Sequence, residues 1–324
     1  MTSPEQRLPV VVLLPLFNDW AAAASLLLNL DAVLHSAQLR AHIVVIDDGS
    51  VIPRPHDFPG FRLHEYASLR ILRLRRNLGH QRALAVGLAF VDEAIECYAV
   101  VVMDADGEDR PEDVVKLLAT FDEHQGRNVV FAERLRRSEN LMFRFFYYLY
   151  RHLHYTLTGI RVRFGNFSVL SRRSLSTLVV VSELWSHYTA AVVKAKLPYV
   201  TMATTRGRRL SGESHMNVVA LIIHGLSAIS VFGDVVGVRL LAGSVFLSVP
   251  ILAGVVATIA VRGLTGLAIP GWATYTVGIL LIILAQLIML SLVFVFMILS
   301  SRANVAFLPI RDYKHFVDAV DVIG

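Results

Sequence analysis

The chain has 324 residues, of which 55% are hydrophobic and 18% charged, with a mean hydropathy of +0.55. This composition is too apolar for an ordinary soluble enzyme and too charged for a pure membrane bundle, and only Arg262 is charged between residues 240 and 301. A soluble domain joined to a membrane segment is therefore expected. The single cysteine, Cys97, excludes an intrachain disulfide, and a net charge of +5 without aromatic residues between the basic clusters gives no support for a nucleic-acid partner.

From Val10 onward, short β-branched runs alternate with amphipathic stretches, which predicts an α/β fold with a mostly parallel, Rossmann-like sheet covered by helices. The expected strands are Val10–Leu16, His42–Asp47, Arg70–Leu74, Ala99–Met103 and Asn128–Ala132. The expected helices are Trp20–Gln38, Gln81–Ala94, Glu112–Gln125 and Leu141–Leu157. Polar residues follow the first four strands, so we expect these strand ends to form one crevice.

Several common enzyme signatures are missing from the sequence. It contains no G-x-G-x-x-G after the first strand, no Walker A lysine loop, no G-x-S-x-G elbow and no H-E-x-x-H. Dinucleotide redox chemistry, P-loop hydrolysis, serine hydrolysis and zinc hydrolysis therefore have no support.

The fourth strand runs into two carboxylates, Asp104 and Asp106. Oxygen ligands of this kind suit Mg²⁺ or Mn²⁺, which keep several waters and are completed by substrate phosphates. Such a metal would stabilise the diphosphate of a nucleotide sugar as a leaving group. A D-x-D alone is a weak signal, because many such pairs are loop carboxylates or helix caps.

Four motifs at successive strand ends together resemble the family 2 glycosyltransferases with the GT-A fold, over about residues 9 to 215. They are Pro15-Leu16-Phe17-Asn18-Asp19, Asp47-Asp48-Gly49-Ser50, Asn77-Leu78-Gly79-His80-Gln81 and Asp104-Ala105-Asp106-Gly107-Glu108. With a transmembrane hairpin following, the chain most resembles the polyprenyl-phosphate glycosyltransferases, a group that includes dolichyl-phosphate mannose synthase and bacterial lipid-phosphate glucosyltransferases.

This resemblance implies a role for each matching residue. The donor would be held by Pro15, Phe17, Asn18, Asp19, Asp47, Asp48, Asn77, Gly79 and Asp104. Asp104 and Asp106 would hold the metal and act in catalysis together with Arg134 and Arg137. The acceptor would be bound by Arg134, Arg137, Arg163, Arg206, Arg209 and Ser214. The structural alternatives are that Asp47 and Asp48 cap a turn and that Asn77 and Gly79 form a helix entry.

The sequence also departs from the family. Glu108 stands where Gln is usual, and the later Asp-x-Gly-x-Phe-Arg pattern appears as Arg163-Phe164-Gly165-Asn166-Phe167-Ser168. The Glu-Asp base pair of hydroxyl-acceptor members is not evident, and Asp92, Glu183 and His187 are only loose substitutes. A lipid phosphate, with a second pKa of about 6, arrives already ionised and needs arginines in place of a base, which favours a phosphate acceptor.

The membrane part contains two uncharged apolar runs, Leu240–Val261 and Val277–Leu299, each long enough to span a bilayer. The run Val218–Phe232 is too short and is expected to lie in the interface, with a re-entrant segment as the alternative. Arginines and a lysine flank the hairpin on both outer sides, whereas Arg262 alone lies between the spans, so both termini and the catalytic domain are expected in the cytoplasm at the inner membrane. No secretory signal is expected, since Met1–Leu8 is polar.

The predicted domains are a GT-A glycosyltransferase domain (1–215), an interfacial segment (216–238), a transmembrane hairpin (239–300) and a cytoplasmic tail (301–324). The leading expectation is an inverting, metal-dependent enzyme that moves a hexose from a nucleotide-diphosphate sugar to a polyprenyl phosphate. One alternative keeps this donor chemistry with a hydroxyl acceptor on a glycolipid or polysaccharide. Another is a non-catalytic membrane scaffold that binds nucleotide sugar, and homo-oligomerisation is left open.

Overall fold

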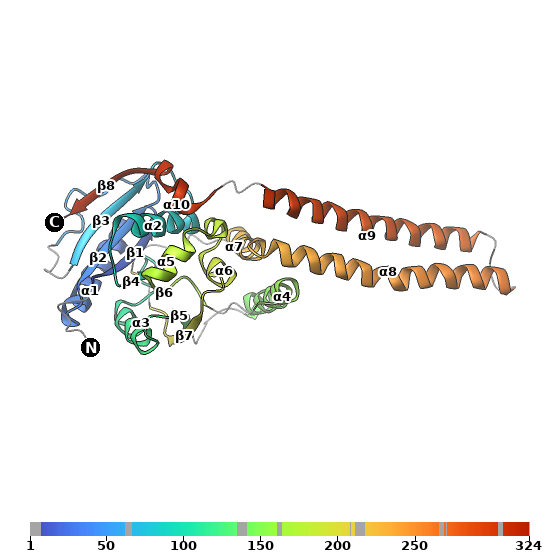
Figure 1. Ribbon diagram of the computed structural model, residues 1–324, viewed down its shortest axis with the longest axis horizontal. Coiled ribbons are helices and arrows are strands. Elements are labelled where there is room, and N and C mark those ends of the chain that lie inside the picture. Colours follow the sequence, from blue (N-terminus) through green and yellow to red (C-terminus); the bar gives the residue numbers. More distant parts are fainter. Residues whose placement is uncertain are drawn as a thin grey trace. The chain divides into compact units, whose positions relative to one another are not determined.

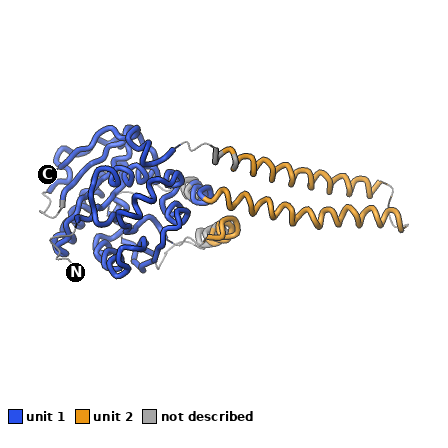
Figure 2. The backbone as a smooth tube through the Cα atoms, viewed as in Figure 1, with its two compact units in different colours: residues 1–146, 162–231, 306–324 blue, residues 147–161, 232–305 orange. Residues whose placement is uncertain are grey.

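The computed structural model describes residues 8–61, 67–134, 141–160, 164–207, 209–210, 218–265, 269, 271–303 and 307–323. It divides into two compact units (Figure 2). The first comprises residues 1–146, 162–231 and 306–324, and the second comprises residues 147–161 and 232–305. The first unit is built around a sheet and the second around packed helices.

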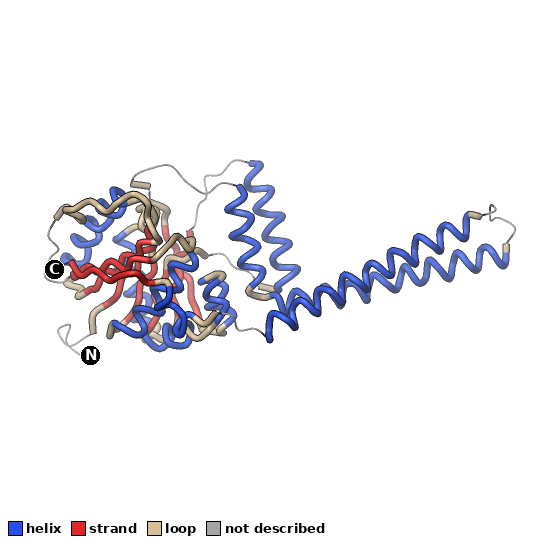
Figure 3. The backbone as a smooth tube through the Cα atoms, turned by 90° about the horizontal axis from the view of Figure 1, so that it is seen from above, coloured by secondary structure: helices blue, strands red, loops and turns tan. Residues whose placement is uncertain are grey.

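The first unit is organised by one eight-stranded sheet (Figures 1 and 3). Its strands lie in the order β7-β5-β6-β4-β1-β2-β3-β8. In chain order they are β1 (Val10–Leu16), β2 (Ala41–Asp47), β3 (Ala67–Leu74), β4 (Ala99–Val102), β5 (Val129–Arg134), β6 (Ser168–Ser171), β7 (Tyr199–Thr204) and β8 (Val317–Ile323). β1 pairs in parallel with β2 and β4, β2 with β3, and β5 with β7, while β6 and β8 run antiparallel to their neighbours. The predicted mostly parallel α/β sheet is confirmed.

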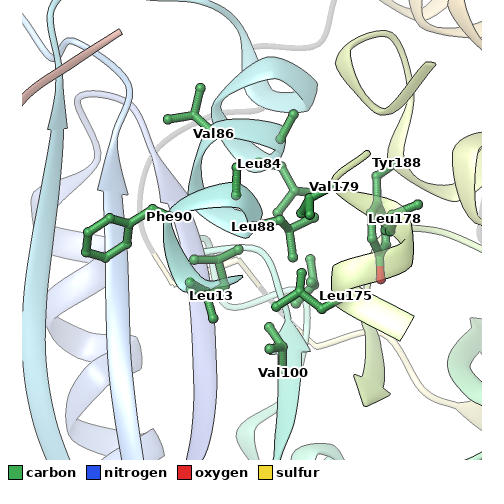
Figure 4. Packing of buried hydrophobic residues seen from close by; sticks show 14 of the residues in the cluster. Leu13, Leu84, Val86, Leu88, Phe90, Val100, Leu175, Leu178, Val179 and Tyr188 are labelled. Atoms are coloured by element: carbon green, nitrogen blue, oxygen red, sulfur yellow. The ribbon is translucent and has the colours of Figure 1, made fainter. Parts of the chain in front are cut away.

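Both faces of the sheet are covered because the strands are apolar on both faces. Within β1, Val11 and Leu13 belong to one buried cluster, and Val10, Val12 and Leu14 to the other. The first cluster is completed by α2 (His80–Ala94), with Leu84 and Leu88 facing Leu13 (Figure 4). The second cluster includes side chains of α1 (Trp20–Ser36) and α3 (Pro111–Glu123). The continuous apolar strands of the sequence therefore mark the centre of a two-faced core.

Shorter helices complete this unit. They are α5 (Arg172–Leu178), α6 (Tyr188–Lys194), α7 (Val218–Ser230) and α10 (Pro309–Asp312), with 3₁₀ turns at Ser182–Trp185 and Tyr313–His315. α7 covers most of the segment predicted to lie in the membrane interface.

The end of the chain is an integral part of the sheet, which corrects the expectation of a tail. β8 pairs antiparallel with β3, and the Arg75 side chain donates to the Val317 carbonyl at 3.1 Å. Side chains of Tyr313 and Lys314 also bind Glu93 on α2. The alternation in Val317–Ile323 reflects a half-buried edge strand rather than a solvated segment.

The second unit is a helical hairpin of α8 (Gly233–Leu264) and α9 (Trp272–Ala303), together with most of α4 (Leu141–Thr158). The two predicted spans lie inside these helices, whose apolar windows have mean hydropathies of 2.3 and 3.0 and are only 6% buried. Apolar side chains that face outward over such lengths are typical of a helix surrounded by lipid.

Small and polar side chains join the two long helices. A Cβ atom at Gly237 would clash with Ile298, and the Ser291 hydroxyl donates to that of Ser244 at 2.6 Å. Small residues and short hydroxyls allow close approach where hydrophobic burial contributes little between helices.

α4 belongs partly with this hairpin, whereas the predicted boundary at residue 215 placed it in the soluble domain. The Arg239 guanidinium, at the start of the first span, donates to the carbonyl oxygens of Tyr155 and Thr156 at 3.2 and 2.8 Å. These carbonyls belong to the last turn of α4, where Tyr155 O also accepts from Gly159 N at 2.7 Å, so the arginine adds a side-chain cap to that helix end.

Candidate active site

The candidate site lies at the carboxyl edge of the sheet, where the topology brings four chain segments together. β1, β2 and β4 run parallel, so the residues after Leu16, Asp47 and Val102 emerge at one edge. β6 runs antiparallel to β4 with Ser168 opposite Val102, so the residues just before β6 reach the same edge. The convergence expected from the sequence is therefore present, with β6 as an additional contributor.

Asn18 and Asp47 shape the loop that follows β2. The Asn18 carboxamide oxygen accepts from Val51 N and Ile52 N at 2.8 and 3.0 Å, and Asp47 Oδ1 accepts from Ser50 N at 2.9 Å. The Asp47 contact is a local turn hydrogen bond of the kind that aspartate favours, whereas Asn18 joins the end of β1 to a loop more than 30 residues later. The Asp47 contact matches the structural alternative for that residue, and together these hydrogen bonds join the loops that follow β1 and β2.

The other first-strand residues differ in accessibility. Pro15 is buried within β1 and opposite Ile46, whereas Phe17 is 43% exposed directly after the strand. Phe17 can therefore offer a ring face to a ligand, while Pro15 contributes to the strand itself. Asp19 lies beside them and pairs with a basic residue described below.

Asp48 joins the β2 loop to the start of α2. Its two carboxylate oxygens accept from Leu78 N at 2.7 Å and from Gly79 N at 2.9 Å. Burial raises the pKa of Asp48 to about 6, although these hydrogen bonds favour the charged form. Gly49 has a positive φ of 65° and lies against the Arg76 backbone, so a side chain there would clash. Hydrogen bonds thus join the motif around Asp48 to the motif that begins at Asn77.

The metal motif forms a tight turn after β4. Asp106 Oδ1 accepts from Glu108 N at 2.9 Å, and Asp104 N donates to the buried Asp109 at 3.0 Å. Among the described residues no group of three or more histidines, cysteines and carboxylates could enclose a metal ion. Two carboxylates at a strand end nevertheless fit Mg²⁺ or Mn²⁺, which are commonly bound by one or two carboxylates with water and phosphate oxygens.

Two of the predicted acceptor arginines lie against this turn. Arg209 is 3.6 Å from Asp19 and 3.9 Å from Asp106, and Arg206 pairs with Glu108. The backbone adds Gly207 N to Glu108 O at 2.8 Å and Leu210 N to Asp106 O at 3.0 Å. We name residues Thr205–Leu210, apart from Arg208, the arginine arm. It connects β7 to the part of the chain that leads to the membrane helices.

The side chains of the remaining acceptor candidates are not among those described. Arg137, Arg163 and Ser214 fall outside the described residues, and of Arg134 only the backbone, at the end of β5, is described. Of the candidates for donor binding, Asn77 is exposed beside Leu78, just before the start of α2.

Sequence reasoning missed a polar contact between His80 and Asn166. Asn166 Nδ2 lies 2.8 Å from His80 Nε2, and the same His80 nitrogen lies 3.5 Å from Asp104 Oδ1. Burial lowers the pKa of His80, against the opposing effect of Asp48, Asp109 and Asp106. The available signal was the altered 163–168 stretch, where Arg163 and Ser168 replace the acidic residue and the arginine of the expected pattern, and Asn166 lies between them.

Comparison with known proteins identifies the class. The model of the family described as glycosyl transferase family 2 matches residues 11–179, just over half of the chain. The protein therefore belongs to glycosyl transferase family 2, and its enzymatic class is that of a glycosyltransferase.

Individual relatives are distant. The chain is 23% identical to an uncharacterized glycosyltransferase, YkcC, of Bacillus subtilis, over 68% of this chain and 67% of that protein. It is 24% identical to a dodecaprenyl-phosphate galacturonate synthase of Rhizobium johnstonii, over 44% of this chain and 40% of the relative. It is 27% identical to an undecaprenyl-phosphate 4-deoxy-4-formamido-L-arabinose transferase of Klebsiella pneumoniae, over 41% and 38% respectively. The chain thus spans well under half of the last two relatives.

Among solved structures, the chain is similar to mannosyl-3-phosphoglycerate synthase from Rubrobacter xylanophilus, with a TM-score of 0.49 and 17% identity over 69% of this chain and 72% of that one. It is also similar to glucosyl-3-phosphoglycerate synthase from Mycobacterium tuberculosis, with a TM-score of 0.48 and 16% identity over 71% and 80%.

Proposed function

We propose that this protein is a membrane-bound, inverting, metal-dependent glycosyltransferase that moves a hexose from a nucleotide-diphosphate sugar to a polyprenyl phosphate. The observation that carries the proposal is the arginine arm, which lies against the carboxylate motif and precedes the membrane helices in the chain. Arg209 is within 4 Å of carboxylates of both the first and the fourth strand ends. A cationic group at this position suits a site that handles two phosphate-bearing substrates.

On the donor side, Phe17 and the loop held by Asn18 and Asp47 would receive the nucleoside. Asp104 and Asp106 would hold Mg²⁺ or Mn²⁺. When bound, this ion supplies positive charge that stabilises the diphosphate as it leaves. The acceptor oxygen attacks the anomeric carbon from the face opposite the leaving diphosphate, so the configuration at that carbon inverts.

On the acceptor side, the side chains considered as general bases all have structural partners. Asp92 pairs with Arg172 at 3.4 Å and accepts from Ser176. Glu183 lies 3.9 Å from Lys194, and His187 Nδ1 accepts from Ala190 N at the start of α6. An acceptor that is already ionised, such as a lipid phosphate, does not need such a base. The names of two relatives include a polyprenyl phosphate, dodecaprenyl phosphate in one and undecaprenyl phosphate in the other. This supports the same acceptor class here.

The membrane arrangement supports access to a lipid. Two long apolar helices follow the catalytic unit, and the chain then returns to form β8 in the same sheet. A segment that leaves the sheet and rejoins it must cross a bilayer an even number of times. We therefore place the catalytic unit and both ends of the chain on the cytoplasmic side of the inner membrane, as the arginine distribution predicts.

The deciding experiment incubates the purified full chain with a panel of nucleotide sugars, Mg²⁺ or Mn²⁺, and either polyprenyl phosphate or the matching polyprenol. Mass analysis of the lipid fraction should show a hexose added to the phosphate-bearing lipid alone. Glycosylation of polyprenol or of a sugar hydroxyl, with the phosphate ignored, would transfer the proposal to a hydroxyl acceptor. Binding of nucleotide sugar with no transfer to any acceptor would point to a scaffold.

A further inference from the structure

The stretch that departs from the family pattern, Gly165–Ser168, lies beside the metal motif. Since Ser168 is opposite Val102 in the antiparallel pair, Asn166 lies next to the residues that follow β4. Along the carboxyl edge the order is β6, β4, β1 and β2. A nucleotide held at β1 and β2 with its diphosphate at β4 would extend its sugar toward β6, where Asn166 stands.

Asn166 is held in place by a closed set of hydrogen bonds. Its Oδ1 accepts from the Thr189 hydroxyl at 3.3 Å, and its Nδ2 lies 2.8 Å from His80 Nε2. The residues adjacent to these two partners are also joined, because Tyr188 N donates to Gln81 Oε1 at 2.7 Å. Two other chain segments, themselves joined to each other, therefore fix one amide side chain, which is how a binding group is preorganised.

Ser168, which stands where the family pattern has an arginine, has a structural role in the core. Its hydroxyl is fully buried, lies 2.7 Å from the Tyr188 hydroxyl and donates to the Asn166 carbonyl at 2.8 Å. Tyr188 is also fully buried, so an arginine at position 168 would meet a closed core. The serine thus supports the backbone of Asn166 in place of the arginine that the family pattern leads one to expect.

The groups gathered here match a sugar hydroxyl. The contacts of the described residues use one of the two Asn166 amide hydrogens, on His80, and Asp104 Oδ1 lies 3.5 Å from the same His80 nitrogen. A hydroxyl both donates and accepts, so a carboxylate acceptor and an amide donor that flank His80 can satisfy it fully.

We propose that Asn166, with His80 and Asp104, forms the sub-site that recognises a hydroxyl of the transferred hexose, and that Thr189 is its positioning residue. This inference rests on the proposed function, because it assumes a nucleotide-sugar donor at the strand ends. It deepens that function by assigning sugar recognition to the altered stretch.

The test compares two probes by calorimetry with full-length protein in detergent and Mg²⁺: the nucleotide sugar that the wild type binds in the donor panel, and its nucleoside diphosphate. Asn166→Ala should weaken binding of the nucleotide sugar about tenfold and leave binding of the nucleoside diphosphate within about twofold of the wild type. Thr189→Val, which keeps the side-chain shape, should give the same selective effect at about threefold. The matched control Asn29→Ala, at an exposed position of α1, should change neither.

Equal weakening of both probes would assign Asn166 to the nucleotide or to the fold, and no change in either would remove it from the site; both outcomes overturn the proposal. If Asn166→Ala does not fold, Thr189→Val carries the comparison with the same two probes. Failure of the wild type to bind any nucleotide sugar would refute the proposed function itself. Normal wild-type binding that is insensitive to Asn166 and Thr189 would refute only the sugar sub-site.

Discussion

Asp48 is a buried carboxylate that holds the start of α2 through two backbone hydrogen bonds. Its pKa, raised by burial to about 6, lies above the ordinary value of 3.8, so ionisation is harder in the folded than in the unfolded protein. The stability contributed by this difference is fully present below pH 4 and is lost as the pH rises through about 6. A shift of this size corresponds to roughly 3 kcal/mol.

We therefore expect unfolding of the wild type and Asp48→Asn to differ in pH dependence. From pH 4.5 to 7.5 the free energy of unfolding of the variant should improve progressively relative to the wild type, on top of a constant cost from the lost acceptor oxygen. Denaturant unfolding in detergent at a series of pH values measures this slope. Asp57→Asn, which removes an exposed carboxylate, serves as the control, and a pH-independent difference for Asp48→Asn would contradict the prediction.

At the scale of residues, the strand-end carboxylates and Asn18 were predictable because each follows an apolar run directly. Their contacts were not: Asn18 binds a backbone 33 residues away, and Asn166 meets His80 across 86 residues. Such pairings depend on which strands are neighbours and on strand direction. Asn166 lies at the site because β6 runs antiparallel to β4. No local pattern in Ser168–Ser171 indicates the direction of this strand.

At the scale of elements, the arginine arm and the Asp104–Glu108 turn are joined by side chains and backbone. Because the Arg209 guanidinium faces Asp19 and Asp106, it opposes a cation that approaches the same carboxylates. Arg209→Gln should therefore bind Mn²⁺ about three- to tenfold more tightly than the wild type in the absence of nucleotide.

Titration of Mn²⁺ followed by electron paramagnetic resonance tests this effect directly. Arg206→Gln, whose partner is Glu108, should change the affinity less, and Asp106→Asn should weaken binding. Weaker Mn²⁺ binding by Arg209→Gln would mean that this side chain supports the metal site instead of competing with it.

The strand β8 makes a second prediction at this scale. Removing residues 317–324 should lower the melting temperature of the catalytic unit by several degrees and promote aggregation, because it exposes the backbone groups of the β3 edge. Thermal unfolding and light scattering in detergent measure both effects. Asp318→Ala removes only an ion pair with Arg73 whose side chains are about half exposed, so it should cost less than about 1 kcal/mol. A truncated protein as stable as the wild type would contradict the role given to β8.

The elements with a strong local signal were predicted to within a few residues. β1 has the predicted bounds, and α2 begins one residue before the prediction. β6, β7 and β8 were missed: β6 has four residues, and β8 finds its partner some 250 residues earlier in the chain. A period-two pattern in Val317–Ile323 was available, but an edge strand cannot be recognised without knowing the edge that it joins.

At the scale of the whole molecule, the chain must leave the catalytic unit, form the α8–α9 hairpin and return to complete the sheet. This connection predicts that the α8–α9 turn lies on the opposite side of the membrane from α1 and β8, and the arginine distribution predicts that α1 and β8 are the cytoplasmic elements. Single cysteines report this arrangement. The natural Cys97 gives little background, because it is buried and burial raises the pKa of its thiol, which lowers the reactive thiolate population.

We expect Thr265→Cys, at the end of α8, to react with a membrane-impermeant maleimide in intact cells. Asn29→Cys on α1 and Val322→Cys, which replaces an exposed side chain of β8, should react only after the membrane is opened. Because one sheet contains β8 and the strands that flank α1, the two cytoplasmic positions must behave alike whatever the orientation of the hairpin. Labelling of Asn29→Cys and Val322→Cys from outside, with Thr265→Cys protected, would reverse the orientation that the arginines predict. Labelling of Asn29→Cys and Val322→Cys from opposite sides would contradict the β3–β8 pairing and would require α7 to cross the membrane as well.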